Sequence, residues 1–314
     1  MRRFSSSILK ATVAAVTVAT IGLGSANVAS AQLPQLPPLP EVPQIPGLPA
    51  APALPPAPGL PFQPVHSGEK EMVTFGDSFT ANAGKGGPRG LAPAQSPLVP
   101  NCATDMDNWP KTAARDLGYS LADWSCNGTG GAPVIQLRAY LELAIQQGSI
   151  GPGTKEVAMM YGGLDTLQWV DAGMDMANIP TPDSTLFRET MRETANRIRQ
   201  VAPNARVSLV SYPEFATNDQ VCLYNEQNVL HPIATPGATQ VQEKFRDSLR
   251  NAAHFAGMNF VDIYPESIGH GTCAPRNEDR WVAGVADPVI GPLPNHPTVQ
   301  GTKAMGHIVA NKLR

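Results

Sequence analysis

Ser78 is the residue whose surroundings point most directly to chemistry. It follows the apolar run 72–75 and the pair Gly76-Asp77, so we expect it in a turn at the end of a buried strand. A serine hydroxyl becomes a nucleophile when a neighbouring base takes its proton and hydrogen-bond donors stabilise the oxyanion that forms. By itself the Gly-Asp-Ser triplet is a weak signal. An ordinary turn or helix-capping serine is the stronger interpretation until the chain supplies a base and an oxyanion hole.

Two of the six histidines lie in loops where a base can be held. His296, in "PLPNHPTVQG", is followed by Pro297 and then Gly301, so it lies in a defined turn. His270, in "SIGHGTC", is the rival, and the residues alone favour His296 only modestly. The other histidines lie at the edge of the proline-rich segment or on or near predicted helices, where surface or structural roles are usual: His66, His231, His254 and His307.

Predicted strands and helices alternate along the chain, which indicates a parallel sheet covered by helices on both faces. The predicted strands are 72–75 and 121–125 and the runs that start at Glu156, Arg206 and Asn259. The predicted helices are 109–117, 134–145, one that follows Asp183-Ser184, 239–256 and 299–313.

In such sheets, ligands bind beyond the carboxyl ends of the strands. Ser78, Gly128 and the pair Gly162-Gly163 each lie just past a predicted strand, so we expect them to gather at this edge. His296 precedes the last predicted helix and can reach the same edge. The fourth residue after Gly76 is Thr80, so the G-x-S-x-G elbow of the common lipase fold is absent.

The first 31 residues have the pattern of a secretory signal peptide. Their start is basic, residues 11–22 are apolar, and residues 29–31 read A-x-A, a cleavage pattern. A retained membrane anchor is the alternative, although the apolar run is short for a bilayer span. We therefore expect a protein that is secreted or held in the cell envelope.

Residues 32–65 are proline-rich, which favours polyproline II over helix or sheet. We interpret this segment as a semi-rigid spacer with a reach of roughly 100 Å, which suits association with the cell envelope. A leader without a role is an equally good interpretation. The remaining residues, 66–314, suit one α/β domain.

The net charge is −3 and the sequence has no basic run, so nucleic acid is not expected as a partner. All four cysteines lie in the predicted domain, and an even number in an exported chain implies two disulfides. Three pairings are open, and the simplest joins Cys102 to Cys126 and Cys222 to Cys273. A zinc site is the rival, but no CxxC or HxxxH spacing supports it, and we expect no metal or other cofactor.

Four blocks of sequence resemble a known family, the SGNH (GDSL-like) hydrolases, and especially their secreted actinobacterial esterases and lipases. The blocks are "VTFGDSFT", "SCNGTGG", "MMYGGLD" and "VDIYPESIGHGTC…RWVAG…NHPTVQGTKAM". The resemblance implies a flavodoxin-like α/β/α sandwich with a short parallel sheet. It implies Ser78 as nucleophile, His296 as base, and the N–H groups of Ser78 and Gly128 as oxyanion donors. It also supports the sequential disulfide pairing.

The chain departs from the family pattern at two positions. Leu164 stands where the third block normally has an asparagine that donates to the oxyanion, and losing one such donor typically costs about 10²–10³ in rate. Asn127, beside Gly128, is a candidate substitute, with a turn residue as the alternative interpretation. Leu293 stands where the fourth block normally has the aspartate that orients the histidine. We expect the Leu293 carbonyl to orient His296, with Asp287 as the fallback.

Together these features predict a secreted serine ester hydrolase acting through an acyl-enzyme. Its expected substrate is an acyl ester of a lipid or of an acylated glycan in the cell envelope. An acyltransferase that passes the acyl group to a glycan or protein hydroxyl is the first alternative. A non-catalytic envelope-binding protein with the same fold is the second, and the substitutions at Leu164 and Leu293 are its best support.

Overall fold

The computed structural model describes residues 68–83, 104–105, 107–128, 135–163, 182–226, 229–287 and 293–314. The predicted signal peptide 1–31 and spacer 32–65 lie outside these residues, so the predicted domain boundaries stay predictions. Within the described ranges, no helix has both the length and the apolar character needed to cross a bilayer.

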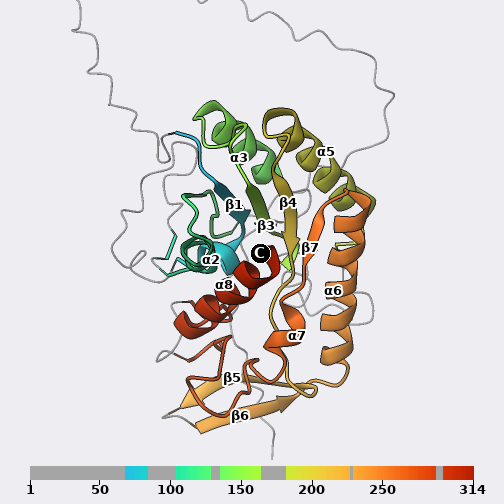
Figure 1. Cartoon of the computed structure of the whole chain (residues 1–314). Coiled ribbons are helices and arrows are strands. Elements are labelled where there is room, and N and C mark those ends of the chain that lie inside the picture. Colours follow the sequence, from blue (N-terminus) through green and yellow to red (C-terminus); the bar gives the residue numbers. More distant parts are fainter. Residues whose placement is uncertain are drawn as a thin grey trace, which may run out of the picture. The chain divides into compact units, whose positions relative to one another are not determined.

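The centre of the fold is a five-stranded sheet in which all neighbouring strands are parallel (Figure 1). Its strands are β1 (Met72–Gly76), β2 (Leu121–Asp123), β3 (Glu156–Met160), β4 (Arg206–Val210) and β7 (Asn259–Val261). The strand order β2-β1-β3-β4-β7 is that of flavodoxin-like folds, in which the order reverses between the first and third strands. Ligands bind at this reversal, so the carboxyl ends of β1 and β3 are the expected place for a site.

Helices cover both faces of the sheet. One core joins the sheet to α3 (Ile135–Gln146), α5 (Thr185–Val201) and α6 (Ala238–Phe255). The other core joins it to α2 (Trp109–Leu117) and α8 (Val299–Leu313), which lie in front of the sheet in Figure 1. The predicted three-layer α/β/α sandwich is confirmed.

Local sequence signals account for most helix ends. The Ser184 side chain caps α5 by accepting from the Phe187 N–H, as the Asp183-Ser184 signal predicts. The Asn108 side chain caps α2, which ends at Gly118 in the left-handed conformation that glycine favours. Helix α8 packs closely on α2, because a Cβ at Gly306 would lie 2.5 Å from Thr112.

Three elements are not predicted from the sequence. Two are one-turn helices, α1 (Ser78–Ala81) and α7 (Tyr264–Ser267). The third is an antiparallel hairpin of β5 (Gln220–Glu226) and β6 (Val229–Ala234), which lies beyond α7 in Figure 1. One edge of β5 pairs with the chain near Ala286, through the Asn225 N–H and the Leu223 carbonyl.

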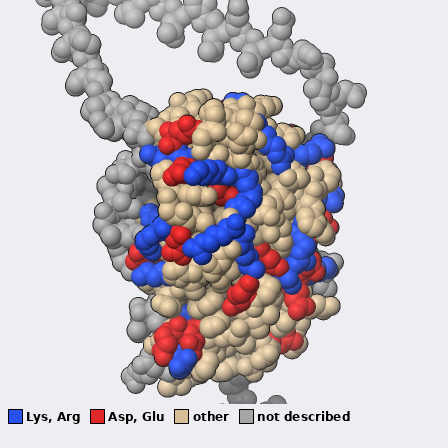
Figure 2. All heavy atoms as spheres, in the orientation of Figure 1, with Lys and Arg blue, Asp and Glu red and all other residues tan. Residues whose placement is uncertain are grey.

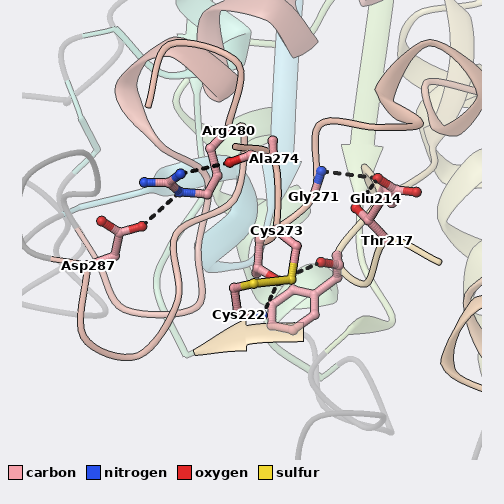
Figure 3. The surroundings of a disulfide bond; sticks show 10 residues. Glu214, Thr217, Cys222, Gly271, Cys273, Ala274, Arg280 and Asp287 are labelled. Carbon is pink, nitrogen blue, oxygen red and sulfur yellow. Dashed lines mark hydrogen bonds and ion pairs between the residues drawn. A yellow bond between two sulfur atoms is a disulfide. The ribbon is translucent and has the colours of Figure 1, made fainter. Parts of the chain in front are cut away.

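The structure contains the Cys222–Cys273 disulfide, which joins β5 to the loop after α7 (Figure 3). Cys126 is also disulfide-bonded. Its predicted partner, Cys102, lies outside the described residues, so that pairing stays a prediction.

Candidate active site

Ser78 lies at the sharp turn between β1 and α1. We call residues 76–82 the serine turn. A Cβ at Gly76 would lie 2.1 Å from the Thr80 Oγ1, so only glycine lets the chain fold back this tightly. The buried Asp77 caps α1 by accepting the Phe79 N–H at 2.9 Å, and its own N–H donates to the Met160 carbonyl at the end of β3. Ser78 is therefore the first helical residue, partly exposed, with an N–H that has no acceptor within a helix.

His296 lies directly against Ser78. Its Nε2 is 2.6 Å from the Ser78 Oγ, across 218 positions of sequence. The Phe79 ring lies 5.0 Å from the His296 ring, centroid to centroid, and covers one side of the contact. The structure thus brings together the serine and the histidine that the sequence blocks single out.

The second ring nitrogen of His296 faces a backbone carbonyl. Nδ1 is 2.6 Å from the Pro294 oxygen. A carbonyl only accepts, so Nδ1 carries the proton, and the lone pair of Nε2 is left to take the proton of Ser78. The prediction of the Leu293 carbonyl is wrong by one residue, because the tight turn before His296 folds the Pro294 oxygen back onto the ring.

Asp287, the fallback orienter, has a different role. It is buried, and its two carboxylate oxygens accept from the Arg280 Nε at 3.0 Å and the Asn225 Nδ2 at 2.9 Å. The orienting bond of His296 goes to Pro294 instead. Asp287 therefore serves to neutralise a buried arginine, and the orienting role is wrong for it.

The surroundings of His296 favour its neutral form. Burial lowers its pKa below the usual 6.5, and the bond to the Pro294 carbonyl offsets part of that decrease. A histidine with a lowered pKa stays unprotonated at neutral pH, which is the form that accepts a proton from serine.

We call residues 293–298 the histidine loop. It is hydrogen-bonded to the segment 280–284: the Ala283 N–H donates to the His296 carbonyl at 2.9 Å, and the Thr298 N–H donates to the Trp281 carbonyl at 2.9 Å. The Thr298 hydroxyl also donates to the Arg280 carbonyl.

Arg280 anchors this segment in turn. Its side chain is fully buried between Asp287 and the Ala274 carbonyl, close to the Cys222–Cys273 disulfide (Figure 3). On the other side of the disulfide, the Glu214 carboxylate accepts from the Gly271 N–H and the Thr217 hydroxyl. The histidine loop thus depends on a disulfide and on two buried charged side chains.

Tyr212, which follows β4, joins the ends of β1 and β3. Its hydroxyl accepts the Gly163 N–H at 3.0 Å and donates to the Asp77 carboxylate. A Cβ at Gly163 would lie 2.8 Å from the Tyr212 ring, which explains the second glycine of "MMYGGLD". Burial raises the pKa of Asp77 to about 7, although the bonds from Tyr212 and the Phe79 N–H oppose the increase. No sequence signal distinguishes this tyrosine, because the contact depends on the β3–β4 neighbourhood.

Two predicted oxyanion residues follow β2. The Cys126 N–H donates to the Gly76 carbonyl at 2.9 Å, which brings this segment beside the serine turn, and Gly128 lies two residues further on with φ of 78°. The Asn127 side chain pairs with the backbone of Ala83, donating to its carbonyl at 2.8 Å and accepting its N–H at 3.3 Å. Asn127 thus ties two loops together, in agreement with the turn interpretation. Leu164 and Asp165 lie outside the described residues.

Two other histidines of the described ranges have different partners. His270 stacks on Trp281 at 4.1 Å between ring centroids, and its Nδ1 contacts the Asp279 carbonyl. His307 is paired with Asp116. Among the described residues, no group of His, Cys, Asp and Glu is placed to hold a metal ion.

Charged side chains of both signs are interspersed on the face shown in Figure 2. Ion pairs among the described residues include Lys155 with Glu71 at 2.8 Å and Lys312 with Glu266 at 2.7 Å.

The family model of the GDSL-like lipases and acylhydrolases matches residues 74–304, a range that contains the serine turn and the histidine loop. The chain belongs to the GDSL-like lipase/acylhydrolase family. It is an ester hydrolase of the lipase and esterase type.

Two curated relatives agree with this assignment. The chain is 27% identical to a protein named Lipase 2 of Streptomyces coelicolor, in an alignment that covers 75% of this chain and 83% of the relative. It is 24% identical to a protein named Esterase of Streptomyces scabiei, in an alignment that covers 77% of this chain and 85% of the relative.

Two solved structures share the fold. They are an extracellular lipase from Streptomyces rimosus, with a TM-score of 0.57, and a phospholipase A1 from Streptomyces albidoflavus, with a TM-score of 0.55. Each is 18% identical to this chain, and each alignment covers 79% of this chain and 100% of the other.

Proposed function

We propose that this family member is a secreted serine esterase that works through a covalent acyl-enzyme. The observation that carries the proposal is the 2.6 Å contact between the Ser78 Oγ and the His296 Nε2. A nucleophile and a base within hydrogen-bond reach, with the base oriented by a third group, is the arrangement that activates a serine.

The proposed reaction has two halves. The Ser78 Oγ attacks the ester carbonyl carbon while its proton passes to the His296 Nε2, and the N–H groups of Ser78 and Gly128 donate to the oxyanion. The protonated His296 then gives its proton to the departing alcohol, which leaves an acyl group on Ser78. Water enters, loses a proton to His296 and releases the acid, which restores the serine.

The Pro294 carbonyl that orients His296 affects how strong a base this histidine is. In a Ser-His-Asp triad, a buried carboxylate both fixes the ring and stabilises the imidazolium that forms. The Pro294 oxygen fixes the tautomer and ring angle but carries no full charge. The expected consequence is a slower enzyme than one with an aspartate at this place.

A lipid or an acylated glycan of the cell envelope is the proposed substrate class. The signal-peptide pattern of residues 1–31 and the proline-rich segment 32–65 support secretion and envelope association. The extracellular lipase of Streptomyces rimosus, which has the same fold, is consistent with a secreted role.

A fluorophosphonate probe tests the proposal. We expect the oxidised protein to be labelled once, at Ser78, as identified by mass spectrometry of the peptide, and Ser78→Ala to be unlabelled. An unlabelled Ser78 in the folded protein would refute the mechanism. His254→Ala is the matched control, since His254 is exposed in the last turn of α6, and it should be labelled at the wild-type rate.

The same protein, given p-nitrophenyl esters of graded chain length with and without a glycan acceptor, distinguishes hydrolysis from transfer. We expect free acid as the main product. Acylated glycan in excess over free acid would favour the acyltransferase.

A further inference from the structure

Asn82 connects the two halves of the proposed site. It is the residue directly after α1 and is fully buried. Its backbone N–H donates to the Ser78 carbonyl at 2.8 Å, and its side-chain Nδ2 donates to the Pro297 carbonyl at 3.0 Å. One residue therefore binds the backbone of the serine and, 215 positions away, the backbone of the residue that follows His296.

Helix α1 is a firm base for this connection even though it has only four residues. A single helical turn is not stable by itself, and its last carbonyls have no partner within the helix. Two such carbonyls are bound by residues before α2: the Asn108 Nδ2 donates to the Thr80 oxygen at 3.0 Å, and the Asp105 N–H donates to the Ala81 oxygen at 2.8 Å. The serine turn is thereby fixed to the main sheet and α2.

The histidine loop has its other hydrogen bonds elsewhere. They go to Arg280, Trp281, Ala283 and Gly284, on the side of the disulfide, and from Thr298 to Gly301 and Thr302 in the first turn of α8. The Asn82–Pro297 bond links residues 76–83 to residues 293–298 beside the Ser78–His296 contact itself. It therefore helps to set how far His296 lies from Ser78.

Asparagine suits this position for two separate reasons. The backbone of Asn82 is left-handed, with φ of 49° and ψ of 33°, a conformation that glycine and asparagine tolerate best. Glycine would allow the turn but has no donor for Pro297. Most residues with a side-chain donor would be strained there.

We propose that Asn82 is a positioning residue that sets the distance between Ser78 and His296 by holding the histidine loop to the end of α1. This role rests on the proposed function, in which His296 takes the proton of Ser78. Proton transfer requires hydrogen-bond distance, and a displacement of about 1 Å can cost about 10²-fold in rate.

Asn82→Gly is the direct test, since it keeps the left-handed turn and removes only the donor. We expect kcat for a short p-nitrophenyl ester to fall about 10- to 100-fold with KM nearly unchanged, and fluorophosphonate labelling to slow by a similar factor. Asn82→Asp is the second variant, because it keeps the shape but sets an oxygen against the Pro297 oxygen, and we expect a similar loss. Asn218→Gly is the matched control, as Asn218 is left-handed with φ of 51° but exposed and distant in sequence from both segments.

Hydrogen exchange separates this proposal from the proposed function. In Asn82→Gly we expect faster exchange in peptides that contain 293–300, with β1 and β3 still protected, whether or not the protein is catalytic. A wild-type protein without labelling at Ser78 would refute the serine mechanism, while the exchange result would still test the connection. A kcat within twofold of wild type together with unchanged exchange at 293–300 would overturn the role of Asn82.

Discussion

The serine turn and the histidine loop meet at the Ser78–His296 contact, which we propose to be catalytic, and at the Asn82–Pro297 bond, but their other partners differ. The serine turn continues a strand in the middle of a parallel sheet, and its partners are backbone groups of β3, the segment after β2 and buried amide side chains. The histidine loop lies outside the sheet: Thr298 caps α8 at one end of it, and its other partners are in segment 280–284, which Arg280 and Asp287 anchor beside the Cys222–Cys273 disulfide.

The two regions are stabilised by different kinds of interaction. Strand pairing and the buried core hold the serine turn in place, and its one acidic residue is Asp77. The hairpin, which the disulfide joins to the loop after α7, packs on a small apolar cluster built on Ala216, Val221 and Ala238. The disulfide and the Arg280–Asp287 ion pair therefore stabilise this half, whereas burial in the core stabilises the serine turn. We expect the two halves to lose their structure under different conditions.

Removing either side chain of the Ser78–His296 contact should have the largest effect on activity. We expect Ser78→Ala and His296→Ala each to lower kcat/KM on the order of 10⁴-fold or more, because proton transfer and attack act as a unit. The double variant should be no worse than the weaker single variant. Steady-state kinetics on a p-nitrophenyl ester measures this, and losses that multiply would mean that the two residues act separately.

Breaking the buried ion pair should selectively harm the histidine loop. Arg280→Met leaves the Asp287 carboxylate buried beside the Asn225 amide without its arginine, and removing one member of a buried pair typically costs about 3–5 kcal/mol. We expect that loss in the free energy of unfolding, measured in urea.

The matched control for this variant is Arg276→Met, since Arg276 is paired with Asp279 on the surface, where such pairs contribute about 1 kcal/mol or less. Equal effects of the two substitutions would contradict the importance of the buried pair. Because Asp287 is the other member of this buried pair, Asp287→Ala should also lower the free energy of unfolding.

Opening the disulfide should act on the same half with a smaller effect. Cys222 and Cys273 are 51 residues apart, and a disulfide of this kind typically contributes about 2–4 kcal/mol. We expect the double variant Cys222→Ser/Cys273→Ser to lose this amount and to show faster hydrogen exchange in the hairpin and in 270–298 than in β1 and β3. Uniform loss of protection across the sheet would mean that the two halves are one cooperative unit.

The serine turn has a pH dependence of its own. The folded pKa of Asp77 is raised to about 7 from 3.8, so its contribution to stability is present at low pH and is lost as the pH rises toward 7. Relative to Asp77→Asn, which does not titrate, the wild-type protein should lose roughly 2 kcal/mol of unfolding free energy between pH 5 and pH 7. Parallel stability curves for the two proteins would show that Asp77 ionises without cost.

The sequence predicts the sheet and its large helices because these elements have strong local signals. Helices α2 and α8 begin and end at the predicted bounds, 109–117 and 299–313. The hairpin is missed, because Pro232 and the exposed residues of β6 obscure any alternation of apolar and polar side chains. Helix α1 is missed because four residues are too few for a periodic pattern.

The sequence alone determined the residue types that chemistry needs: a serine after a buried strand, glycines at the ends of neighbouring strands and a histidine in a proline-bounded turn. These follow from local rules, since strand ends, turns and caps depend on neighbours in the chain. Only the tertiary structure decided which carbonyl orients His296, that Asp287 neutralises Arg280, and that Tyr212 and Asn82 join distant segments. Such contacts are made between residues far apart in sequence, so their distances depend on how whole elements pack and not on any local pattern.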